Sequence, residues 1–311
     1  MIYTWLTLLF LLYQQFHIPD NITITENGKT VESVNRQEFT IPLTDTFIDV
    51  EKYNEFVNNI ESKIYKEPTN ASLDDNGIIT PEQTGYKLNR QAFGDQFYSY
   101  FFNNGPATIE IPGLVVFPKV DSELLASIKT KQIGYYITFF NSRNKERSHN
   151  IELATQAINN HVVFPGETFS FNSVVGKRTK DKGYLPAPVI VRGELTEGIG
   201  GGICQVSSTL FNAVDRAGLS IGERYSHSKR VPYVPEGRDA TVSWYGPDFT
   251  FHNKHNQPIL IRAKAIHGKM IVTVYSSDVI DNAPRKVENA PKKLPKEIKE
   301  KQQFPDALFH H

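Results

Sequence analysis

The chain has little cysteine, no excess of either charge and no long apolar run at its start. One cysteine, Cys204, occurs among 311 residues, so no disulfide can form within the chain and the thiol needs another explanation. Lysine plus arginine and aspartate plus glutamate number 34 each, and this balance gives no support to a nucleic-acid partner, for which a basic excess is expected. The N-terminal apolar run, Ile2 to Tyr13, is shorter than the ~20 residues that span a membrane.

This apolar run has the length of the hydrophobic part of a secretory signal. No lysine or arginine precedes it and no Ala-x-Ala cleavage site follows it. We expect residues 1–19 to direct export, either as a cleaved signal or as a retained membrane anchor; the alternative is an aromatic helix packed on the domain. If the protein is exported, its single cysteine also means that disulfides do not stabilise the fold.

Hydrophobic periodicity predicts an α+β fold with two domains. The first domain, residues 20–130, is an α+β unit that offers no obvious catalytic group. Its predicted elements are strands at 21–25 and 107–117, helices at 47–65 and 89–103, and a hairpin turn at Asn76-Gly77.

The second domain, residues 131–276, is predicted to be rich in strands, at 134–140, 169–175, 189–191, 240–244, 249–251, 259–266 and 270–275. Asn150 is expected to cap a helix whose inward face carries Ile151, Ala154 and Ile158. A glycine-rich loop leads into a second helix, which starts at Cys204 and ends before Gly218. Residues 277–311 are rich in proline, lysine and glutamate, which predicts a disordered tail or a docking arm.

The position of Cys204 is one that makes a thiol reactive. The first turn of a helix presents unpaired N–H groups and the positive end of the helix dipole, and both favour the thiolate. In such a position the pKa of a thiol can fall from ~8.5 to roughly 3.5–7.5. The preceding glycines supply N–H groups that can face an oxyanion. The alternative is that Cys204 is a small buried apolar residue.

Thiol catalysis also needs a base and a group that orients it, and His227 and Asp239 are the candidates. His227 lies in a polar connection shortly after the Cys204 helix, and such a loop can return to the helix start. Asp239 follows Arg238, so the pair offers a carboxylate to orient His227 and a cation to bind a substrate carboxylate. An exposed loop histidine and an ordinary turn salt bridge are the alternatives.

The other histidines suggest no chemistry. His252 and His255 superficially resemble metal ligands in their spacing, but no third ligand lies nearby in the sequence, so we expect no metal and no cofactor. His149 and His161 flank the helix of Asn150 and are expected to be structural or surface residues.

Several motifs together closely resemble the VanW family. They are Phe169-Ser-Phe-Asn, Gly176-Lys-Arg-Thr, Gly183-Tyr, Pro186-Ala-Pro, Gly198-Ile-Gly-Gly-Gly-Ile-Cys-Gln-Val-Ser-Ser-Thr-Leu-Phe-Asn-Ala, His227-Ser and Gly237-Arg-Asp-Ala. The resemblance covers Ile133 to Tyr275, and the glycine-rich cysteine block is long and specific. The first domain, with Ile79-Thr-Pro-Glu-Gln-Thr-Gly-Tyr-Lys-Leu, looks like the peptidoglycan-binding domain that often precedes VanW domains.

The resemblance implies a role in the bacterial cell wall. The family name comes from glycopeptide-resistance gene clusters, and VanW domains have been linked to L,D-transpeptidase activity with the family's cysteine as nucleophile. By resemblance that nucleophile is Cys204, with His227 and Asp239 as its expected catalytic partners. The expected substrate-binding and oxyanion residues are Gly200, Gly201, Gly202, Ser207, Ser228 and Arg238.

The resulting hypothesis is acyl transfer on peptidoglycan stem peptides, through a Cys204 thioester that yields 3-3 cross-links. Two alternatives stay open. One is a non-catalytic peptidoglycan-binding or assembly protein, and the other is a cysteine amidase or endopeptidase that uses water as acceptor. The expected partners are stem peptides or glycan, and the expected location is extracytoplasmic, associated with the wall or anchored in the membrane of a Gram-positive type of bacterium.

Overall fold

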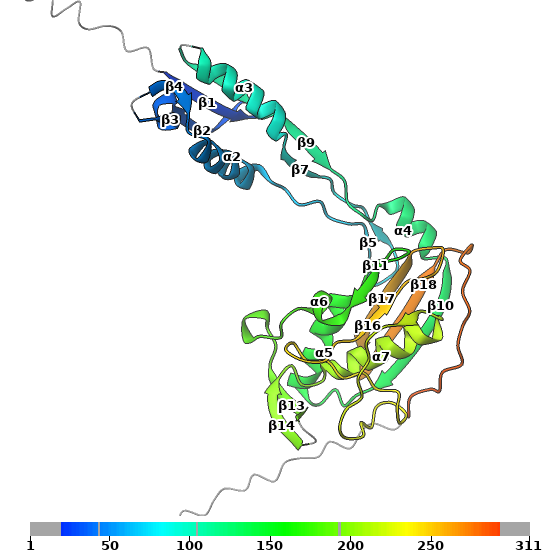
Figure 1. The fold of residues 1–311 in the computed structure, drawn as a ribbon. Coiled ribbons are helices and arrows are strands. Elements are labelled where there is room, and N and C mark those ends of the chain that lie inside the picture. Colours follow the sequence, from blue (N-terminus) through cyan, green and yellow to red (C-terminus); the bar gives the residue numbers. More distant parts are fainter. Residues whose placement is uncertain (1–19, 43, 104, 192–193, 293–311) are drawn as a thin grey trace, which may run out of the picture. The chain divides into compact units, whose positions relative to one another are not determined.

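The computed structural model describes residues 20–42, 44–103, 105–191 and 194–292, and the expected signal or anchor at 1–19 lies outside them (Figure 1). The chain divides into two compact units, the first formed by Met1–Ala71 with Thr80–Asp121 and the second by Ser72–Ile79 with Ser122–His311. The main division thus falls near residue 121 rather than 130. None of the helices in the described ranges combines the length and apolar character needed to cross a membrane.

The first unit is built from two helices and short strands around an aromatic core. Its helices are α2 (Val50–Ile64), α3 (Arg90–Phe102) and the 3-10 helix η1 (Arg36–Phe39). Its strands are β1 (Asn21–Glu26), β2 (Lys29–Asn35), β3 (Thr40–Ile41), β4 (Thr44–Ile48), β7 (Gly85–Leu88), β8 (Ala107–Glu110) and β9 (Gly113–Val116). β1 lies between β2 and β8 in a three-stranded sheet, and its neighbour β8 runs parallel to it.

Local side chains explain where these elements begin. Asp49 accepts hydrogen bonds from the first turn of α2 and Asn89 from the first turn of α3, which is the usual role of such residues at a helix N-cap. The predicted strand at 107–117 is instead the two strands β8 and β9. Pro112 separates them, and since it has no N–H group it cannot continue a strand ladder.

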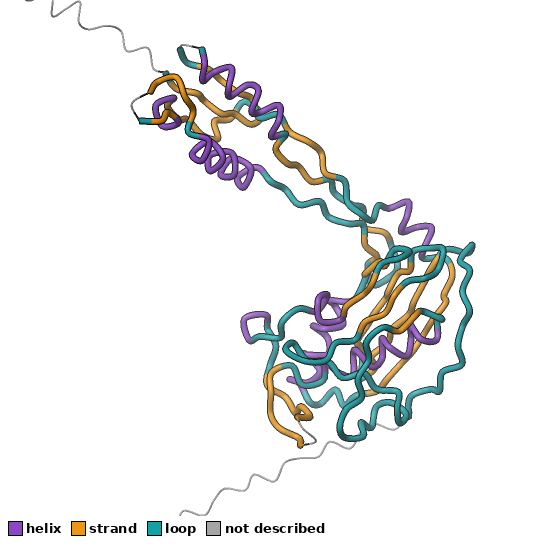
Figure 2. The backbone as a smooth tube through the Cα atoms, in the orientation of Figure 1, coloured by secondary structure: helices purple, strands orange, loops and turns teal. Residues whose placement is uncertain are grey.

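The second unit contains a four-stranded antiparallel sheet with two long helices on one face (Figures 1 and 2). The sheet has the order β10 (Lys131–Phe139), β18 (Lys269–Ser276), β17 (Ile259–Ile266), β11 (His161–Val163). Helix α7 (Ile203–Arg216) packs on β10 and β18, and α5 (Lys145–Ile158) packs on β17 and beside α7. The smaller elements are α4 (Ser122–Ile128), β5 (Ser72–Leu73), β6 (Ile79–Thr80), β12 (Thr168–Ser170), α6 (Phe171–Val175), η2 (Lys180–Lys182), β13 (Pro186–Val191), β14 (Glu194–Ile199), β15 (Ser220–Ile221) and β16 (Thr250–His252).

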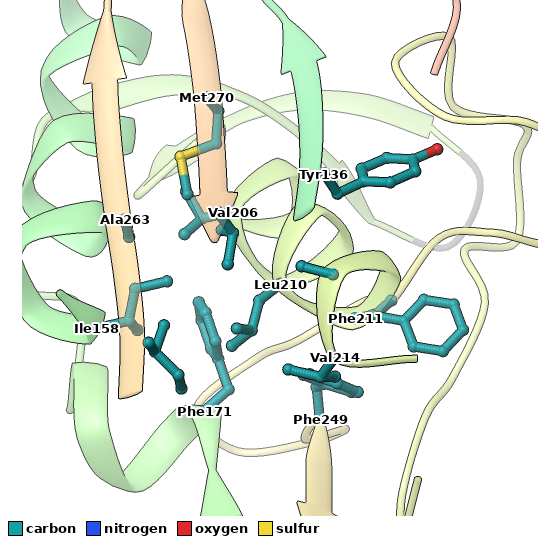
Figure 3. Close-up of a cluster of buried hydrophobic side chains, with 14 of the residues drawn as sticks. Tyr136, Ile158, Phe171, Val206, Leu210, Phe211, Val214, Phe249, Ala263 and Met270 are labelled. Carbon is teal, nitrogen blue, oxygen red and sulfur yellow. The ribbon is translucent and has the colours of Figure 1, made fainter. Parts of the chain in front are cut away.

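The core of this unit forms around α7. Leu210 and Val214 on this helix lie beside Phe171 and Phe249, and all four are fully buried (Figure 3). Gly134 of β10 lets the helix come close to the sheet, because a Cβ atom there would lie 2.3 Å from the carbonyl oxygen of Ala213. The C-terminal part of α7 is therefore held close against the sheet.

Asn150 is not a helix cap, and this prediction was wrong. Helix α5 begins at Lys145, and its cap is Asn144, whose side chain accepts a hydrogen bond from the N–H group of Arg147. Asn150 is fully buried in the middle of the helix. Its amide hydrogen-bonds both backbone groups of Leu185 and the carbonyl oxygen of Gly201, so it ties α5 to the glycine-rich loop.

Two predicted strands also take another form. Residues 169–175 are divided between β12 and α6, because the Ser170 side chain accepts a hydrogen bond from the Ser173 N–H group and caps a short helix. Residues 240–244 form no strand and make only an isolated bridge, between Tyr225 and Thr241. Helix side chains rather than a neighbouring strand satisfy the backbone groups of Ala240.

Of the two expectations for the C-terminal segment, residues 277–292 agree with the docking arm and not with the disordered tail. Ile280, Val287 and Ala290 are buried in the core of the second unit. The Arg285 guanidinium donates to Asp215 and to the carbonyl oxygen of Leu219, while its N–H group donates to Arg216. We call residues 277–292 the strap. Composition alone did not decide whether this segment packs on the second unit. Its few apolar residues are spaced to meet the core, and backbone contacts with α7 complete its docking.

Two truncations test whether the strap stabilises the second unit. A chain that ends after Lys292 should keep its stability, whereas a chain that ends after Ser276 should lose about 3 kcal/mol or more, since Ile280 and Val287 each contribute roughly 1.5–3 kcal/mol on burial. Urea unfolding followed by fluorescence would measure the difference. Equal midpoints for the two truncations would contradict the packing of the strap.

Candidate functional site

The site is centred on the thiol of Cys204, the second residue of α7. The helix begins one residue before the predicted start, and Gly202 caps it in a left-handed conformation with φ of +108°. Cys204 is partly exposed. Its Sγ lies 3.6 Å from the carbonyl oxygen of Val242 and 3.8 Å from Oγ1 of Thr241. The predicted position at the head of a helix is confirmed.

The structure brings His227 and Asp239 to this thiol. Nδ1 of His227 and Oδ2 of Asp239 are 2.6 Å apart, and the backbone N–H group of His227 donates to the same oxygen at 2.6 Å. The two side chains are only 6% and 9% exposed. Cys204 and His227 lie close enough for each to shift the pKa of the other, and because Nδ1 is taken by Asp239, Nε2 is the ring nitrogen left for the sulfur.

The three groups shift one another's protonation. Burial raises the pKa of the Cys204 thiol, but the hydrogen bond and charge of His227 outweigh burial, so the pKa is below its ordinary value. Burial lowers the pKa of His227, while hydrogen bonds to Asp239 and Cys204 raise it to about 9. Burial raises the pKa of Asp239, but its bonds from His227 hold that pKa low. Together these shifts favour the thiolate, imidazolium and carboxylate forms of the three groups.

Polar side chains of α7 hold the segment that carries Asp239. Oγ of Ser207 donates to the carbonyl oxygen of Ala240 at 2.6 Å, and Oγ of Ser208 accepts from the N–H group of Ala240 at 2.9 Å. One turn further on, the Asn212 amide donates to the carbonyl oxygen of Arg238 at 2.8 Å. Residues 238–240 are thus fixed against the same helix that carries the thiol.

The glycine-rich loop is packed tightly on its inner side. A Cβ atom on Gly201 would lie 2.6 Å from backbone atoms of Ala187 and Pro188 in β13, and one on Gly202 would lie 3.0 Å from Ile151 of α5. Gly200 adopts φ of +86°. Within the described part of the chain, the N–H groups of Gly201, Gly202 and Cys204 donate no hydrogen bond to the backbone.

Two of the predicted binding residues, Arg238 and Ser207, make contacts within the protein, and a third, Ser228, is exposed. Arg238 donates to Asn212 and Asp215 at 2.7 Å each and lies over the Phe211 ring. Asp215 is eleven residues after Cys204 in the sequence, which is about 16 Å along the helix, so Arg238 is directed away from the thiol. Ser207 is buried and positions Ala240 instead of facing a ligand. Ser228 is exposed beside His227.

Sequence reasoning missed several residues at the site. Thr241 and Val242 lie against the sulfur, and Ser208 and Asn212 hold the Asp239 segment. Tyr233 is buried nearby, where burial and the Cys204 charge raise its pKa and a hydrogen bond with Ser208 partly opposes them. The polar face of α7 was the available signal, because serines at 207 and 208 and asparagine at 212 would otherwise face a core.

The described residues contain no group of three or more histidine, cysteine, aspartate or glutamate side chains placed to hold a metal ion. Nδ1 of His252 lies 2.6 Å from Oγ1 of Thr168, the residue that pairs with it between β12 and β16. His255 is held through its N–H group by Asn253.

Comparison with known proteins matches both units. Residues 146–275 match the family described as VanW like protein, and residues 23–110 match the family described as "Putative peptidoglycan binding domain". The chain is 60% identical to "Uncharacterized protein YoaR" of Bacillus subtilis, over 97% of this chain and 100% of that protein. It is 38% identical to "Vancomycin B-type resistance protein VanW" of Enterococcus faecalis, over 30% of this chain and 36% of that protein. No solved structure matches.

The chain belongs to the VanW family, and a peptidoglycan-binding domain precedes its VanW domain, as the motifs predicted. Cys204, His227 and Asp239 all fall within the VanW match. The two domains give the protein a role related to the cell wall, with peptidoglycan as partner.

The pKa directions predict how the thiol reacts with iodoacetamide. Alkylation of Cys204 should rise with pH at a midpoint below that of a free thiol, ~8.5, because His227 holds the thiolate. In Asp239→Asn, the pKa of His227 should fall from about 9 towards its ordinary value, and the alkylation midpoint should move to higher pH.

Mass spectrometry of the labelled protein across pH 5–10 would follow the reaction. Asp278→Asn is the matched control, since it removes the same charge at an exposed position of the strap. A midpoint at or above that of a free thiol in the unsubstituted protein would contradict the ion pair.

Proposed function

We propose that this protein is a cysteine acyltransferase of the L,D-transpeptidase type that acts on peptidoglycan stem peptides. The observation that carries the proposal is that Cys204, His227 and Asp239 lie together at the head of α7. The 2.6 Å hydrogen bond between His227 and Asp239 fixes the imidazole. A thiol, a base hydrogen-bonded to it and a carboxylate that orients the base are the parts that nucleophilic acyl transfer requires.

In the first half-reaction, the Cys204 thiolate attacks the carbonyl carbon of the third residue of a donor tetrapeptide. The oxyanion that forms accepts hydrogen bonds from the N–H groups of Gly201, Gly202 and Cys204, which have no backbone acceptor in the described chain. As the C–N bond breaks, the His227 imidazolium gives its proton to the departing amine of the terminal D-alanine. A thioester and a neutral imidazole remain.

In the second half-reaction, the side-chain amine of a neighbouring stem attacks the thioester. Neutral His227 takes a proton from this amine while the C–S bond breaks, so the imidazolium and thiolate are restored and a 3-3 cross-link is formed. Asp239 keeps the imidazole in one orientation and stabilises its charged form throughout. The peptidoglycan-binding domain would hold wall polymer close to this centre and raise the local concentration of stems.

Purified protein incubated with a disaccharide-tetrapeptide tests the proposal, with mass spectrometry as readout. We expect a cross-linked dimer with release of D-alanine. Cys204→Ala should abolish the product, and His227→Asn should slow it by about 100-fold or more, in the range lost with a general acid-base group. His267→Asn is the matched control, because His267 is exposed at a turn with φ of +49° that asparagine also adopts.

Each other outcome of this experiment has a clear meaning. Release of D-alanine without a dimer would replace transfer by hydrolysis, with water as acceptor. Unchanged substrate, together with wall binding that persists in Cys204→Ala, would overturn the enzyme and leave a binding protein. A cross-link formed by folded Cys204→Ala would remove the thiol from the mechanism.

A further inference from the structure

Arg178 is a partly buried cation that forms no ion pair with a carboxylate of the described chain. Its Nη2 atom is covered by protein and has no hydrogen-bond partner. Within the described ranges, no aspartate or glutamate forms an ion pair with it. A guanidinium cannot lose its proton in a protein, so the charge persists. Buried charges are otherwise paired, and an unpaired one calls for a partner outside the chain.

The rest of the Arg178 side chain is held in place. Nη1 donates to Oδ1 of Asn172 at 2.7 Å, and the guanidinium carbon lies 5.7 Å from the centre of the Phe171 ring. Asn172 in turn donates to the carbonyl oxygens of Ser243 and Pro247. The guanidinium is therefore fixed before any ligand arrives, which lowers the entropy lost on binding.

Arg178 is next to the loop that carries the nucleophile. Its Cβ and Cγ atoms lie 3.4 and 3.5 Å from where a Cβ on Gly200 would be, and Gly200 is four residues before Cys204. Burial lowers the pKa of Arg178, while the charges of Tyr184, Cys204 and Asp248 oppose this.

The Asp248 carboxylate attracts Arg178 through space but forms no ion pair with it, and its hydrogen bonds are made with other groups. It accepts hydrogen bonds from Oγ of Ser170 and from the N–H groups of Asn172 and Phe249. The Nη2 atom of Arg178 thus remains a hydrogen-bond donor without a partner in the described chain.

We propose that Arg178 is the residue that recognises the acyl donor, by binding a carboxylate of the stem peptide. This inference rests on the proposed function. It assigns carboxylate binding to Arg178 instead of Arg238, because Arg238 is bound to Asp215. A planar guanidinium with one occupied and one free nitrogen suits a carboxylate, which accepts charge-assisted hydrogen bonds. Nη2 exposes no surface in the ligand-free chain, so a neighbouring side chain must turn aside as the carboxylate enters.

The donor's C-terminal carboxylate is the group that fits this position best. It is separated from the scissile carbonyl carbon only by the amide nitrogen and the α-carbon of the terminal D-residue. The stem of the Arg178 side chain lies beside the loop that precedes the nucleophile, and in this proposal its guanidinium holds that carboxylate while the carbonyl lies over the thiol. An internal carboxylate of the stem is the other source of the same chemistry.

The test compares a tetrapeptide with a free C-terminus and the same peptide with a C-terminal amide. The unsubstituted protein should favour the free acid by about 10- to 100-fold in kcat/KM, the value of a hydrogen bond to a charged group. Arg178→Gln keeps a donor for Asn172 but removes the charge, and it should lose this preference. Lys177→Gln is the matched control, because it removes the same charge from an exposed neighbouring side chain.

Binding measured in a Cys204→Ala background separates this inference from the proposed function, because no turnover is needed. Calorimetry should show tighter binding of the acid than of the amide, and Arg178→Gln should abolish the difference. Acid and amide bound equally, with both weakened by Arg178→Gln, would assign the contact to an internal carboxylate. Binding that is unaffected by Arg178→Gln, or no binding of either peptide, would overturn the inference even if cross-linking occurs.

Discussion

The site depends on the hydrogen bonds between the polar face of α7 and the backbone of residues 238–240. Ser207, Ser208 and Asn212 satisfy backbone groups that a strand neighbour would otherwise satisfy. Since the same helix carries Cys204, the thiol and the Asp239 carboxylate share one rigid support. His227 is then positioned at the sulfur by two hydrogen bonds to Asp239, one from its ring and one from its backbone N–H group. Buried polar networks of this kind rigidify a fold only when every member has a partner.

The three side chains of the site stabilise one another's charges because they lie close together. Burial opposes ionisation of Cys204, His227 and Asp239, yet each is stabilised in its charged form by its neighbour. In the proposed mechanism, neighbouring side chains therefore favour the thiolate form of Cys204. Arg178 differs from these three residues because it forms no ion pair. It adds a positive charge beside the loop of the nucleophile and has no acidic partner in the described chain.

The rest of the second unit keeps α7 in place. Gly134 allows the helix to approach the sheet, and Asn150 ties the glycine-rich loop to α5. The strap contacts the far end of the helix, where Asp215 binds both Arg238 and Arg285. One aspartate therefore links the strap to the segment that carries Asp239. This shared contact makes the C-terminal segment a part of the domain, although the family match ends at residue 275.

What the sequence by itself determined is local. The helical spacing after Cys204, the glycines before it and the two-domain α+β division follow from patterns of neighbouring residues, and the motifs identified the family. Only the tertiary structure decided that Asn150 is a buried tether, that Arg238 binds Asp215, that the strap docks and that Arg178 is unpaired. These depend on contacts between residues far apart in the chain. A side chain's partner is set by how the elements pack, because hydrogen-bonding capacity is a property of the residue whereas its satisfaction depends on what surrounds it.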